Sequence, residues 1–85
     1  MTMQYRIICY NRSTDEVGGL FPIPGRYLAR VLKIAGIKNA KELGEYPLND
    51  EQIRDIAALI GLKPNFSRFA YHLEPLGHTQ YHLRA

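Results

Sequence analysis

The chain has 85 residues, 46% of them hydrophobic and 22% charged, with a formal net charge of +3 and one cysteine. This length gives one domain, and the composition excludes a disordered chain. The cysteine count excludes an intrachain disulfide, and no apolar run approaches the roughly 20 residues of a membrane helix. We therefore expect a single cytoplasmic domain over residues 1–85, with no membrane partner and no signal peptide.

The charges are segregated along the chain. Residues 1–41 contain seven Lys or Arg against two acidic residues, whereas residues 42–62 contain five acidic residues against one Arg. Residues 63–85 contain three basic residues against one acidic residue. The acidic middle block would repel a nucleic-acid backbone that ran past it, so nucleic acid is not the expected partner.

The first predicted element is a β-hairpin, with a strand over residues 3–10, a polar turn over 11–16 and a return strand over 17–23. Gly18 and Gly19 indicate a bulge or a close approach of another part of the chain. Pro22 and Pro24 cannot donate ladder hydrogen bonds, which indicates that the return strand is either an edge strand or a short one.

A helix is predicted to begin at Pro24 or Gly25. Its apolar residues have the i, i+3, i+4, i+7 spacing of one helical stripe: Leu28, Val31, Leu32 and Ala35. Gly36 is expected to end this helix in a left-handed conformation, with Ile37 as the apolar residue that follows such an end.

The second half of the chain predicts another helix between two less regular stretches. A helical turn is expected over residues 39–43, followed by a connection over residues 44–47. Asn49 and Gln52 fit the capping box that begins a helix, and Gly61 is expected to end it.

The last clear element is an alternating segment over residues 65–75, which predicts a strand. Residues 80–84 either pair back as a further strand or form a tail. The elements together predict an α+β fold in the order β-β-α-α-β(-β). A small antiparallel sheet of three to four strands would carry two main helices on one face.

No motif indicates catalysis, a cofactor or a metal site. The histidines His72, His78 and His82 lie in a strand, turn and tail pattern that does not make them converge with Cys9. Cys9 alternates with apolar residues of the first strand, which is typical of a small core residue and not of a nucleophile. We expect a protein that is not an enzyme and binds no cofactor or metal.

Two charged groups are candidate partner-binding surfaces. Arg26, Arg30 and Lys33 form a basic stripe on the first helix, which could meet phosphates or an acidic protein surface. The second group, the acidic block, comprises Glu42, Glu45, Asp50, Glu51 and Asp55, with Tyr46 among them. Carboxylates around a tyrosine are what an inhibitor can present to a basic nuclease site. Solvated surface is the alternative for both groups.

Three short motifs carry a family resemblance: Tyr10–Glu16 with the following Gly18-Gly19, Asn65–Pro75, and Tyr46-Pro47-Leu48. The first two resemble the two ends of cloacin-type bacteriocin immunity proteins. The third is similar to a Tyr-Pro-Leu/Ile motif that precedes the last helix in a related group of small bacterial proteins. The resemblance implies a twisted antiparallel sheet, no catalysis, and tight inhibition of a toxin domain.

On this resemblance we expect an immunity protein, an antitoxin of contact-dependent growth inhibition or bacteriocin systems, that blocks the active site of a cognate nuclease toxin. Cloacin-type immunity proteins are acidic, whereas this chain carries +3. Two arrangements stay open, because either the acidic block or the basic stripe could face the toxin. Tyr10, Tyr27 and Tyr46 are the candidate aromatic anchors. The alternative is a small nucleic-acid-binding or regulatory module that uses the basic stripe. The oligomeric state stays open.

Overall fold

The computed structural model describes residues 4–38 and 44–76. Its elements run in the order β1 (Tyr5–Asn11), β2 (Val17–Pro22), the 3₁₀-helix η1 (Gly25–Tyr27), α1 (Leu28–Ala35), β3 (Tyr46–Pro47), α2 (Asp50–Ile60) and β4 (Phe69–Pro75). The predicted fold class is confirmed: a small antiparallel four-stranded sheet with two main helices, an α+β fold.

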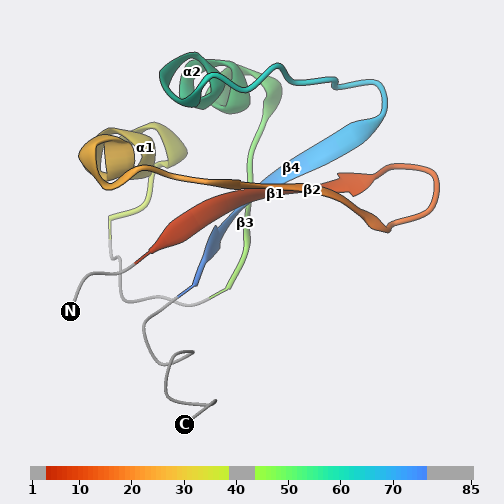
Figure 1. The fold of residues 1–85 in the computed structure, drawn as a ribbon, viewed down its shortest axis with the longest axis horizontal. Helices are drawn as coiled ribbons and strands as arrows, with labels where there is room; N and C mark the ends of the chain where they lie inside the picture. Colours follow the sequence, from red (N-terminus) through yellow and green to blue (C-terminus); the bar gives the residue numbers. More distant parts are fainter. Residues whose placement is uncertain (1–3, 39–43, 77–85) are drawn as a thin grey trace, which may run out of the picture.

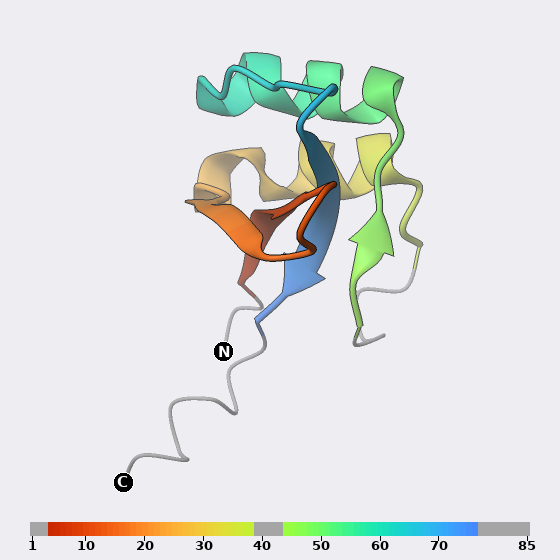
Figure 2. The same cartoon turned by 90° about the vertical axis from the view of Figure 1, so that its right-hand side faces the viewer.

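The strands lie in the order β2-β1-β4-β3, and every neighbouring pair is antiparallel. The two central strands, β1 and β4, pair along their whole length, from Tyr5 opposite Pro75 to Asn11 opposite Phe69. Both helices lie on the same side of this twisted sheet (Figures 1 and 2). β2 is an edge strand, which is one of the two alternatives that Pro22 and Pro24 predicted.

Alternation along the strands divides the sheet into two faces. The side under the helices is called the covered face, and its core residues are Tyr5, Ile7, Cys9, Tyr71 and Leu73. These pack with Val31 of α1 and with Ile53 and Ile56 of α2. The other side is called the open face, and its residues from the two central strands are Arg6, Ile8, Tyr10, Ala70, His72 and Glu74.

The hairpin between β1 and β2 is held by its own polar residues. The Asn11 side-chain oxygen accepts hydrogen bonds from the Ser13 and Thr14 N–H groups at 2.8 and 3.3 Å. The register slips after Cys9, which lies opposite Gly19, so that Gly18 is the extra residue of a bulge. A Cβ atom at Gly18 would overlap the ring of Phe69. The sequence predicted a bulge or a close approach at this glycine pair, and the structure has both.

The helix ends also follow the sequence. Gly36 is left-handed at φ 76°, and the Ile37 N–H donates to the Leu32 carbonyl at 3.0 Å, which closes α1 as expected. Asn49 and Gln52 form the reciprocal capping box of α2, with distances of 2.8 and 2.9 Å. These local bonds fix where each helix begins or ends before any long-range packing is considered.

One predicted connection is corrected. Within residues 44–47, Tyr46 and Pro47 form the two-residue strand β3, opposite Leu73 and His72 of β4. A strand this short has no alternating run that could reveal it in the sequence. The helical turn expected over 39–43 and the strand or tail expected over 80–84 lie outside the described residues. In the part of the chain that is described, neither helix has the length and apolar character needed to cross a bilayer.

Candidate functional site

Three side chains from distant parts of the sequence meet on the open face. The Tyr10 hydroxyl donates to the Glu45 carboxylate and lies 2.8 Å from both of its oxygens. The His72 ring contacts the Tyr10 ring edge-on, with centroids 5.3 Å apart and planes at 85°. His72 Nδ1 lies 3.5 Å from Glu45 Oε1. We call these three residues the Tyr10 cluster.

The sheet register brings the Tyr10 cluster together. Tyr10 pairs with Ala70, so His72, two residues further along β4, projects from the same face beside it. β3 pairs Tyr46 with Leu73 on the covered face, so the preceding residue, Glu45, reaches the open face. The two residues of β3 are therefore what positions the carboxylate of the cluster.

The hydrogen bonds of the cluster change the acidity of its tyrosine. The pKa of Tyr10 is raised, first by the hydrogen bond to Glu45, then by desolvation and by the negative charges of Glu45 and Glu74, with Arg6 acting in the opposite direction. Loss of the phenolic proton would remove the donor and place two negative charges side by side. The neutral tyrosine is thus the form that holds Glu45.

The His72 nitrogen is less well satisfied. Its Nδ1 atom is buried, and among the described residues it makes no hydrogen bond. The 3.5 Å separation from Glu45 is within reach of an ion pair if the imidazole is protonated, but it lacks hydrogen-bond geometry. The ring-to-ring contact with Tyr10 is thus the better-formed of the two His72 interactions.

An ion pair lies beside the Tyr10 cluster on the same face. Arg6 Nε donates to Glu74 Oε1 at 2.7 Å, and the two side chains are 31% and 24% exposed. The guanidinium of Arg6 is therefore already paired with a carboxylate. Within residues 4–38 and 44–76, the Glu45 carboxylate has no Lys or Arg partner, and His72, which approaches it at 3.5 Å, balances its charge only when protonated.

Apolar side chains continue the surface toward the β2 edge. Leu20 pairs with Ile8, and Val17 pairs with Tyr10, so both β2 residues lie on the open face. Leu20 is 47% exposed and Val17 is 54% exposed, and they are the exposed large hydrophobic residues of the described chain. The open face therefore combines an aromatic ring and exposed apolar side chains, which are typical of protein interfaces, with one carboxylate.

The structure separates the residues of the predicted acidic block. Glu45 lies on the open face, whereas three exposed carboxylates lie on α2, in the helix layer: Asp50, Glu51 and Asp55. Tyr46 is half-buried and packs against the core on the covered face. Glu42 lies outside the described residues. The described part of the block is thus divided between two surfaces, and of its members Glu45 is the one that contacts Tyr10 of β1.

The basic stripe is present on the helix side of the molecule. Arg26 lies in η1, whereas Arg30 and Lys33 lie in α1, and all three are exposed. Val31 of α1 is buried. The Arg26 guanidinium lies 4.7 Å from the centre of the Tyr27 ring, which is itself half-buried against the core. In the described part of the chain, none of the three forms an ion pair.

Cys9 is confirmed as a core residue, because it is 2% exposed on the covered face. Burial raises the pKa of its thiol, and a hydrogen bond with the Gly18 backbone acts in the opposite direction. The described residues contain no group of three potential metal ligands. The histidines His78 and His82 lie outside them.

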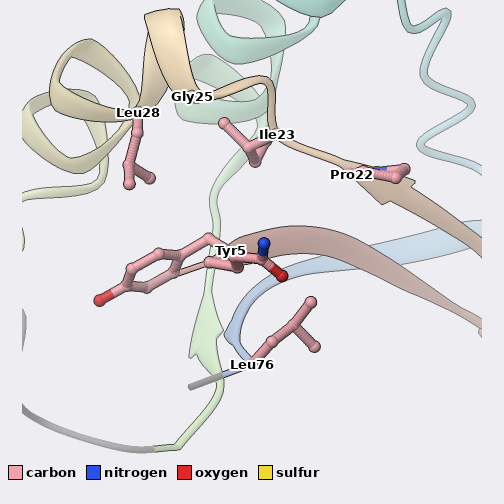
Figure 3. A pocket seen from close by; sticks show the side chains of 7 residues that line it. Tyr5, Pro22, Ile23, Gly25, Leu28 and Leu76 are labelled. Carbon is pink, nitrogen blue, oxygen red and sulfur yellow. The ribbon is translucent and has the colours of Figure 1, made fainter. Parts of the chain in front are cut away.

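A pocket of about 280 Å³ opens elsewhere, between the start of β1, the end of β2 and the start of the first helical segment (Figure 3). Its walls are mainly apolar, with Ile23 and Leu28 on one side and Leu76 on the other. Tyr5 lies between them. None of the residues predicted to bind a partner lines this pocket, so it is a feature separate from the Tyr10 cluster.

A comparison with known protein families identifies the family of this chain. Residues 4–74 match the family model described as "Domain of unknown function (DUF7683)". The chain belongs to this family. The matched range contains β1 through Glu74 of β4, and thus every residue of the open face that is described above. No curated protein and no solved structure matches the chain.

Sequence reasoning missed three residues of this surface as candidates: His72, Leu20 and Val17. Alternation along residues 65–75 already placed His72 opposite the buried side chains, and that was the available signal. The sequence carried no such signal for Leu20 and Val17, because the bulge between them breaks the alternation that would assign each residue to a face.

Proposed function

We propose that this protein is a cytoplasmic immunity protein that binds a cognate interbacterial toxin and blocks its active site. The observation that carries the proposal is the open face. On one side the sheet holds the core together, and on the other it presents Tyr10, Glu45 and two exposed apolar side chains. The resemblance to cloacin-type immunity proteins supports the same function and supplies the class of target, a nuclease toxin.

The proposed mechanism is occlusion without chemistry. Nuclease active sites carry positive charge because they bind phosphates, and a carboxylate surface can occupy the same position. Glu45 would provide charge complementarity, which sets the association rate and the choice of partner. Tyr10 would provide a buried aromatic anchor, the kind of residue that contributes most to the affinity of protein interfaces.

Growth rescue tests the proposal. An immunity gene is expected directly downstream of its toxin gene, so the toxin domain found upstream of this gene is expressed alone and together with this chain in a susceptible host. We expect the toxin alone to stop growth and co-expression to restore it, while an immunity protein from an unrelated system gives no rescue. A neighbourhood without a toxin gene, or continued growth arrest despite a folded, soluble chain, would contradict the proposal.

A second candidate function is supported by the basic stripe. Arg26, Arg30 and Lys33 are exposed together, without an ion pair in the described residues, and could contact nucleic-acid phosphates. Fluorescence anisotropy against single-stranded RNA and duplex DNA at low ionic strength tests this candidate. Salt-sensitive binding that Arg30→Gln weakens would favour it, and absence of binding to either probe would remove it.

A further inference from the structure

The outer surfaces of the molecule differ in kind. The outer side of α1 exposes Arg30 and Lys33, and the outer side of α2 exposes Asp55 beside Arg54, so both are charged helix surfaces. The open face instead brings apolar, aromatic and charged side chains together, including the two exposed large hydrophobic residues of the described chain. Interface centres are rich in aromatic residues and poor in freely solvated charge, so the open face fits an interface best.

The Glu45 carboxylate on this face is already held in place. The Tyr10 hydroxyl contacts both carboxylate oxygens at 2.8 Å, which restricts the side chain without neutralising it. A carboxylate has about four acceptor positions, so others stay available for a partner. Less side-chain freedom then remains to be lost on binding, which favours affinity.

The charges on the open face indicate which kind of partner it would bind. Arg6 is paired with Glu74 at 2.7 Å, and Glu45 has no Lys or Arg among the described residues. A complementary partner therefore brings a cation to Glu45. Arginine suits the position better than lysine, because its planar group can bind a carboxylate through two hydrogen bonds and can also stack on the ring of Tyr10.

We infer that the open face is the toxin-binding surface, with an arginine of the toxin seated on Glu45 and Tyr10 and apolar toxin side chains over Leu20 and Val17. This inference rests on the proposed function and chooses between the arrangements that the sequence left open. The acidic residues of α2 and the basic stripe of η1 and α1 then lie outside the centre of the contact.

Calorimetric titration tests the inference with the catalytically inactivated toxin domain encoded upstream. Two open-face variants, Glu45→Gln and Leu20→Ser, are compared with a control on α2, Glu51→Gln, which makes the same chemical change at another exposed glutamate. We expect Kd to rise about tenfold or more for each open-face variant and less than about twofold for the control. Circular dichroism and thermal melting check that each variant is folded. Tyr10→Phe provides a further variant that removes only the hydroxyl.

The outcomes separate the two proposals. If the unmodified chain does not bind the toxin domain, the proposed function fails and the inference fails with it. If the chain binds but Glu51→Gln costs more than Glu45→Gln, or neither open-face change weakens binding, the inference alone is overturned. Double-mutant cycles between Glu45→Gln and Ala variants of each exposed toxin arginine test the proposed arginine contact directly. At least one pair should couple by about fivefold or more, and no coupling would exclude the arginine.

Discussion

The covered and open faces of the sheet are made by the same strands, yet most of their side chains differ in role, with Ile8 the buried exception on the open face. In β1, Tyr5 and Ile7 are 2% and 0% exposed beneath the helices, whereas Arg6 and Tyr10 lie on the other side and form side-chain hydrogen bonds. A strand with a two-residue period can therefore stabilise the fold with one set of residues and present a binding surface with the other. Effects on stability and effects on binding should then separate between neighbouring residues.

The largest expected difference between the faces comes from a matched pair of leucines. Leu73 is fully buried on the covered face, whereas Leu20 is 47% exposed on the open face. We expect Leu73→Ala to lower the free energy of unfolding by about 2–5 kcal/mol, through lost burial and a cavity. Leu20→Ala should lower it by less than about 1 kcal/mol. Urea titration followed by circular dichroism measures both, and equal losses would show that the open face is also part of the core.

A smaller loss of stability is expected from a substitution at Gly18, where the edge strand β2 approaches the covered face. Gly18→Ala would place a methyl group in steric overlap with the Cε1 edge of the Phe69 ring, which packs against the core, so the ring or β2 must move. We expect a loss of about 1–3 kcal/mol, typical of overpacking. Gly25→Ala is the control, because no atom lies within 4 Å of its added Cβ and its φ is not positive. If Gly18→Ala were no worse than Gly25→Ala, the bulge would not depend on this close approach.

The covered face was largely predictable from sequence, because its determinants are local. The stripe around Val31 and the capping box at Asn49 each depend on residues within a few positions of one another. The open face was not predictable as a site. Tyr10 and Glu45 are 35 positions apart, and their contact depends on the register between β1 and β4 and on the two-residue β3. Both residues were candidates for chemical reasons, but nothing in the sequence indicated that they touch.

The ion pair of the open face should contribute little to stability. Arg6 and Glu74 are partly exposed, and pairs of this kind are screened by water and salt. A double-mutant cycle with Arg6→Gln and Glu74→Gln should give a coupling of about 0.2–1 kcal/mol that falls as salt is added. The urea titration used for the leucines can measure it. A coupling of several kcal/mol that salt does not change would mean that the pair is shielded from solvent, and the open face would then be less open than its geometry indicates.

The smallest effect concerns the proton on Tyr10, and it tests the cluster without a partner. Its hydroxyl hydrogen bond to Glu45 raises the pKa of Tyr10 above the ordinary value near 10. Because the folded-state pKa is the higher one, this bond stabilises the fold fully below the unfolded-state pKa and loses its effect as pH rises through the folded-state value. NMR titration of ¹³Cζ-labelled tyrosine, assigned with Tyr10→Phe, should show Tyr10 ionising at higher pH than a free tyrosine. Glu45→Gln should lower that pKa toward the ordinary value, since the amide carries no charge beside the phenolate, while Glu51→Gln on α2 should leave it unchanged. An unshifted pKa of Tyr10 would mean that its hydroxyl does not hold the Glu45 carboxylate in solution. The proposed position for the toxin's arginine would then not be formed before binding.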